Sequence, residues 1–137
     1  MATHSRIAIE NPNGSVKSVY CHNDGYPSYN GRVLLEHYSD RDKVERLIEL
    51  GDLSSISEEV EPTGPHSFSQ PARGVVIAYH RDRGEDYRSP DSHSSIKSFA
   101  SSIKDYSYVF TKEGQWLFID GHKSRGKRAP VPLEEVI

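Results

Sequence analysis

Two segments at opposite ends of the chain carry the alternation of apolar and polar residues that is typical of β-hairpins. In the first, R-I-A-I-E and S-V-K-S-V-Y-C-H flank N-P-N-G, where Asn13 and Gly14 form a strong two-residue turn signal. In the second, Y-S-Y-V-F-T and W-L-F-I-D flank the glycine turn K-E-G-Q. Any fold of this chain must accommodate an antiparallel strand pair at each end.

Helical periodicity dominates the segments between the hairpins. Residues 32–51 predict helix, with Gly51 placed to end it, and residues 94–104 place apolar side chains at the i, i+3, i+4, i+7 spacing of an amphipathic helix. The β-branched run at residues 74–80 predicts a strand buried on both faces and central in the sheet. The order β-β-α-β-α-β-β favours an α+β fold, in which helices pack on one face of an antiparallel or mixed sheet.

The composition predicts one domain with a thin core. The 137 residues fit a single domain, 1–137, and the hydrophobic set is 34% of the chain. Small domains with little apolar surface often gain stability from subunit contacts, so we expect a homo-oligomer. The single cysteine excludes an intramolecular disulfide, and we expect Cys21 to be buried and structural.

Charge and hydropathy limit the classes of partner that this chain can bind. A net charge of −3 and a pI near 6.1 argue against general nucleic-acid binding, although residues 121–128 form an exposed basic segment. The apolar runs are too short for a membrane partner and the first residues lack a signal-peptide pattern, which favours a soluble, cytoplasmic protein. No nucleotide-loop, dinucleotide-fold, hydrolase or metal-ligand spacing is present, so we expect no cofactor and no metal.

The stretch Y-C-H-N-D-G-Y-P-S-Y-N-G is the first candidate site. Its side chains suit stacking on a planar base and hydrogen bonding to ribose or phosphate. The members of this set are Tyr20, His22, Asp24, Tyr26 and Tyr29. The alternative is a well-specified turn, because asparagine, aspartate, glycine and proline are ordinary turn residues.

The stretch Y-H-R-D-R-G-E-D-Y-R is the second candidate. Arg81, Arg83 and Arg88 can each present a planar fork to phosphate. Asp82, Glu85 and Asp86 supply possible partners for ribose or for the arginines. The alternative is a charged loop whose opposite charges pair with one another.

An enzymatic interpretation uses the same two stretches. His22 or His80 would act as general acid or base on a phosphodiester or glycosidic bond, oriented by Asp24 or Glu85.

The phrases Y-C-H-N-D-G-Y-P and R-D-R-G-E, with L-I-E-L-G-D-L-S-S-I between them, resemble a family of small bacteriophage and prophage accessory proteins. The resemblance covers most of the chain up to Asp86, and Asn23 departs from the tryptophan of many relatives. It implies a role in the host cytoplasm and supplies no mechanism.

By analogy with other phage proteins that counter host defence, we expect a non-enzymatic protein that sequesters a nucleotide-derived signal. A cyclic ADP-ribose derivative or a cyclic dinucleotide fits the expected tyrosines and arginines. Two alternatives stay open: a phosphodiesterase or glycohydrolase that cleaves such a signal, and an inhibitor that binds a host protein.

Overall fold

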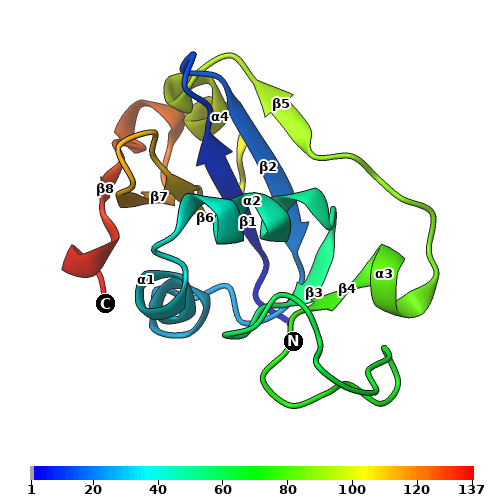
Figure 1. The fold of residues 1–137 in the computed structure, drawn as a ribbon. Coiled ribbons are helices and arrows are strands. Elements are labelled where there is room, and N and C mark those ends of the chain that lie inside the picture. The colour runs from blue at the N-terminus through cyan, green and yellow to red at the C-terminus, as the bar shows by residue number, and fades with distance from the viewer. Residues whose placement is uncertain (1) are drawn as a thin grey trace.

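The fold was analysed in a computed structural model that describes residues 2–137 (Figure 1). Strands and helices alternate along the chain in the order expected for an α+β protein, with several additional short strands. The strands are β1 (Ser5–Glu10), β2 (Val16–Cys21), β3 (Leu53–Ser55), β4 (Ile77–Ala78), β5 (Asp91–His93), β6 (Tyr106–Phe110), β7 (Trp116–Asp120) and β8 (Val131–Pro132). The α-helices are α1 (Arg32–His37), α2 (Arg41–Glu49), α3 (Tyr79–Arg83) and α4 (Ile96–Ser102).

Both expected hairpins are present, and they join through their first strands. The sheet order is β4-β3-β2-β1-β6-β7-β8, with β1 and β6 parallel at its centre and β5 pairing with part of β2. The two turns have the same hydrogen bonds: Gly14 N donates to Asn11 O, and Gly114 N donates to Thr111 O. Both glycines have left-handed φ values, 89° and 86°, which explains their presence. The first turn is thus longer than the two-residue turn that we expected.

Helices cover both faces of this mixed sheet. Ile7 and Ile9 of β1 face α1 and α2, whereas the intervening Ala8 packs in a second apolar cluster with Phe99 and Ile103. Because neighbouring residues of a strand point to opposite faces, α4 lies on the face opposite to α1 and α2. The α+β class with a mixed sheet is confirmed, but its helices are divided between two faces instead of sharing one.

Of the β-branched run at 74–80, Ile77–Ala78 form strand β4 at the edge of the sheet and the last two residues begin α3, so the expected central strand is wrong. β4 pairs only with β3, at the end of the sheet. Val76 is nevertheless fully buried, because the long connection after β3 folds over it and Val76 N donates to Glu59 O. A continuous apolar run reports burial on two faces, which a covering loop provides as well as a second strand does.

The charged segment after β4 differs from the expected loop. Its first residues form helix α3. This helix ends at Gly84, which has a left-handed φ of 79°. The C-terminal residues dock on the sheet: β8 pairs with β7, and Leu133 is fully buried. Within residues 2–137, no helix is long and apolar enough to span a bilayer.

Arg128, in the basic segment, closes the end of α4. Its Nη1 atom donates to the carbonyl oxygens of Ile103 at 2.6 Å and Ala100 at 3.1 Å, and Nε donates to Lys123 O at 2.8 Å. The last carbonyls of a helix lack intrahelical partners, and a cation there also favours the helix dipole. The basic segment is therefore held against α4 by one of its own arginines.

We expect Arg128→Ala to lower the free energy of unfolding by about 1.5–3 kcal/mol, because it removes charged hydrogen bonds to α4. Urea unfolding followed by circular dichroism measures this change. Arg125→Ala, at an exposed neighbouring position, is the matched control and should change stability by less than about 0.5 kcal/mol. Equal stabilities of the two variants would contradict the role assigned to Arg128.

Candidate functional site

The tyrosine-rich stretch after β2 is divided between the two faces of the sheet. Tyr20 pairs with Arg6 and so projects on the face covered by α4. Tyr26 packs against Tyr106, which pairs with Ser5 and projects on the opposite face. One ligand held by all the expected tyrosines of a single chain is therefore excluded by the geometry.

Glycine and aspartate in this stretch have structural roles. A Cβ at Gly25 would lie 2.5 Å from the carbonyl oxygen of His4, so only glycine fits there. Tyr108 donates a hydrogen bond of 2.6 Å to Gly25 O. Asp24 has a left-handed φ of 59° and is exposed. The turn interpretation thus explains this part of the stretch.

Tyr26 and Tyr29 belong to an exposed aromatic cluster with Tyr106 and His122. Ring centroids are 6.3 Å apart for Tyr26 and Tyr29, 5.6 Å for Tyr26 and Tyr106, and 4.5 Å for Tyr106 and His122. Tyr26 and Tyr29 are 46% and 58% exposed. Burial does not account for these two rings, so their faces are free to contact a ligand.

A groove of about 340 Å³ adjoins this aromatic cluster. Its floor is apolar, with Phe118, Val131 and Val136, and its rim carries Lys123 and Lys127. Tyr106 of the cluster pairs with Asp120, which also lines the groove, and packs 5.9 Å from the Phe118 ring. We call the aromatic cluster and this groove together the tyrosine–lysine groove. No carboxylate pairs with either lysine within residues 2–137.

Arg81 is occupied by internal partners. Its Nη1 and Nη2 atoms donate to the carbonyl oxygens of Val60 at 2.6 Å and Val76 at 2.7 Å. Its Nε donates to Asp82 at 2.8 Å. Burial alone would raise the pKa of Asp82, but hydrogen bonds from Arg81, the Ala78 amide and the His66 ring outweigh it and lower the pKa. Arg81 therefore fastens the long connection to β4 and has little capacity for phosphate.

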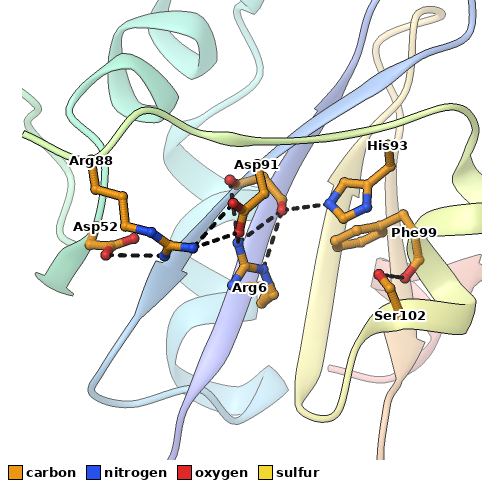
Figure 2. Close-up of polar contacts among 8 residues, drawn as sticks. Arg6, Asp52, Arg88, Asp91, His93, Phe99 and Ser102 are labelled. Carbon is orange, nitrogen blue, oxygen red and sulfur yellow. Dashed lines mark hydrogen bonds and ion pairs between the residues drawn. The ribbon is translucent and has the colours of Figure 1, made fainter.

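The other two expected arginines point to different partners. Arg83 lies over the Phe68 ring at 4.8 Å and pairs with Glu85. Arg88 pairs with Asp91 and Asp52 (Figure 2). The three guanidinium groups therefore do not point toward a common ligand position.

A buried polar network links β5 to β2 (Figure 2). Arg6 pairs with Asp91 at 2.7 Å and donates to Ser18 Oγ from Nε and Nη2. Since Arg6 only donates, the Ser18 hydroxyl directs its proton to His93 Nε2, 3.0 Å away. Burial, followed by the charge of Arg6, lowers the pKa of His93. Ser18 is fully buried and closed to substrate, so this serine–histidine pair is structural.

Two histidines converge on the hydroxyl of Tyr20. Its Oη atom lies 2.8 Å from His4 Nδ1 and 2.7 Å from His22 Nδ1, and the imidazole centroids are 4.7 Å apart. Burial raises the pKa of Tyr20, which keeps its hydroxyl protonated. Neither Nε2 atom is buried, and neither has a hydrogen-bond partner within residues 2–137. We call this group the His4–Tyr20–His22 cluster. It lies on the same sheet face as α4.

The remaining catalytic candidates lie apart from this cluster. His80 Nδ1 contacts the backbone oxygen of Glu85 at 2.6 Å, and no hydrogen bond joins Asp24 to His22 in the described chain. Burial raises the pKa of Cys21 to about 12, which keeps the thiol neutral and agrees with a structural role. No group of three metal-ligating side chains occurs within residues 2–137, and the absence of a cofactor stays a prediction.

Sequence reasoning missed His4, Tyr106 and the two groove lysines. His4 precedes β1, and only the register with β2 places it beside His22. The basic segment was recognised, yet nothing in its spacing indicated Tyr26 and Tyr29 as its neighbours.

The depressed pKa of His93 predicts a loss of stability in acid. The unfolded chain binds a proton near pH 6.5 more readily than the folded chain, so this contribution is present above that pH and is lost as the pH falls below it. We expect the free energy of unfolding to fall less between pH 7.5 and pH 5.0 in His93→Gln than in the unmodified protein. Urea unfolding at both pH values measures this, and an identical fall in both proteins would contradict it.

No protein-family model, curated protein or solved structure matches the chain.

Proposed function

We propose that this protein binds a nucleotide-like phosphorylated molecule in the tyrosine–lysine groove. The observation that carries the proposal is a groove with two lysines that pair with no carboxylate within residues 2–137. Tyr106 connects this groove to the exposed rings of Tyr26 and Tyr29. Aromatic faces stack on bases of any sequence, and lysine is a common partner of phosphate. An apolar groove with a few polar groups is the usual form of a small-molecule site.

The size of the groove favours a mononucleotide or a compact dinucleotide. Its volume of about 340 Å³ lies at the lower end of the range for small-molecule sites. Tyr26 and Tyr29 would cover the base, and Lys123 and Lys127 would hold phosphate. These lysines take the role that the sequence gave to Arg81, Arg83 and Arg88.

We further propose sequestration as the biological role, in line with the resemblance to phage accessory proteins. A nucleotide-derived immune signal of the cyclic ADP-ribose or cyclic dinucleotide type has the required planar base and phosphate. Assembly into a homo-oligomer stays a prediction. Exposed Val136 and Ile137 beside the groove are the surfaces that such an assembly would bury.

Isothermal titration calorimetry with cyclic dinucleotides and ADP-ribose derivatives tests the binding. We expect Tyr29→Ala and Lys127→Ala each to weaken the affinity about 5- to 150-fold, which corresponds to the 1–3 kcal/mol typical of base stacking and of charged hydrogen bonds. Tyr87→Ala and Lys112→Ala are matched controls, because both positions are exposed and lie outside the groove.

Binding by no member of the panel, or equal losses in the control variants, would contradict the proposal. Ligand released intact by heat supports sequestration. Capture of one stoichiometric host protein that competes with no nucleotide would assign the exposed tyrosines to a protein interface instead.

A further inference from the structure

The proton positions in the His4–Tyr20–His22 cluster follow from its acceptors. His4 Nδ1 lies 3.0 Å from the backbone oxygen of His22, which only accepts, so His4 carries its proton on Nδ1. That proton is shared between the carbonyl oxygen and Tyr20 Oη, 2.8 Å away. The Tyr20 hydroxyl then donates its single proton to His22 Nδ1. The two imidazoles are therefore fixed in opposite tautomers.

Because the tautomers are opposite, the two Nε2 atoms, which have no partner within residues 2–137, differ in their hydrogen-bonding role. His4 presents an unprotonated Nε2, which is a proton acceptor. His22 presents an Nε2–H, which is a hydrogen-bond donor. The ring centroids of His4 and His22 lie 4.7 Å apart at an interplanar angle of 35°, a separation that one phosphodiester group can span.

The geometry points to a second, catalytic site in which His4 and His22 cleave the 3′,5′-phosphodiester of a ribonucleotide. His4 Nε2 takes the proton of the 2′-hydroxyl, and the resulting oxygen attacks phosphorus. The bond from phosphorus to the 5′-oxygen breaks, that oxygen takes a proton from water, and His4 releases its own proton to solvent. His22 Nε2–H stabilises a non-bridging oxygen and keeps its proton, so the products are a 2′,3′-cyclic phosphate and a free 5′-hydroxyl.

A ribonucleotide is the phosphodiester that requires the fewest catalytic groups from the protein, because it carries its own nucleophile. Its 2′-hydroxyl is already held next to phosphorus, so one base and one donor suffice for attack. The cluster also lies outside the apolar cluster that α4 covers on this sheet face, and its histidines are partly exposed. This inference does not depend on ligand binding in the tyrosine–lysine groove, because Tyr20 and Tyr106 project from opposite faces.

The test uses the full chain with two linear substrates, adenylyl-(3′,5′)-adenosine and its 5′-phosphorylated form, and their 2′-deoxy analogues as controls. We expect the ribonucleotides to yield 2′,3′-cyclic phosphate, and the deoxy analogues to stay intact. His4→Gln and His22→Gln should each lower the rate about 10²- to 10⁴-fold. His37→Gln, at an exposed position at the end of α1 and outside both proposed sites, should retain the rate.

Absence of cleavage by the unmodified protein would overturn the proposal, as would a His4→Gln variant of unchanged rate. Calorimetry of Lys127→Ala tests the groove, and the cleavage rate of the unmodified protein tests this cluster, so the two proposals can fail independently. Circular dichroism identifies a variant that fails to fold, and the deoxy analogues keep the test decisive in the unmodified protein.

A tautomer measurement tests the positioning role of Tyr20. Nitrogen NMR of the unmodified protein should show the proton on Nδ1 of His4 and on Nε2 of His22. Tyr20→Phe should remove the tautomer preference of His22 and lower the rate at least 10-fold. The same tautomer at both histidines would refute the arrangement, whereas a purely structural tyrosine would leave both tautomers and the rate unchanged.

Discussion

Parallel pairing of β1 with β6 is the interaction on which the rest of this structure depends. It joins residues that are about 100 positions apart and brings two independently formed hairpins into one sheet. Lys112 N donates to Glu10 Oε1 where the two turns meet, which fixes the ends of the pair. Because long-range strand pairing costs chain entropy before it is stabilised, the packing of helices on both faces must hold this central pair together.

The same pairing decides which side chains can act together. Alternation along β1 and β6 sends Arg6 and Tyr20 to the face of α4, and Tyr106 to the face of α1 and α2. A polar half-face and an aromatic groove therefore form back to back. Each holds residues from the tyrosine-rich stretch, and neither uses all of them.

Polar side chains whose donors and acceptors are already paired within the protein have structural roles. Those with an unpaired donor or acceptor can bind a ligand. The guanidinium groups of Arg81 and Arg128 donate hydrogen bonds to backbone carbonyls. Ser18 is fully buried and contacts Arg6 and His93. His4 and His22 use only their Nδ1 atoms internally. Their Nε2 atoms have no hydrogen-bond partner within residues 2–137 and can therefore contact a ligand.

The sequence by itself determined the two hairpins, the presence of helix within residues 32–51, and the α+β class, although the structure divides that helix into α1 and α2. These follow from periodicity, turn residues and glycine, which act over a few neighbouring positions. Tertiary structure alone decided that β4 lies at an edge, that α4 packs on the second face, and that Tyr29 lies beside the groove while Tyr20 meets His4. Each of these depends on strand register and on which distant segment supplies the covering surface, and local patterns carry no information about either.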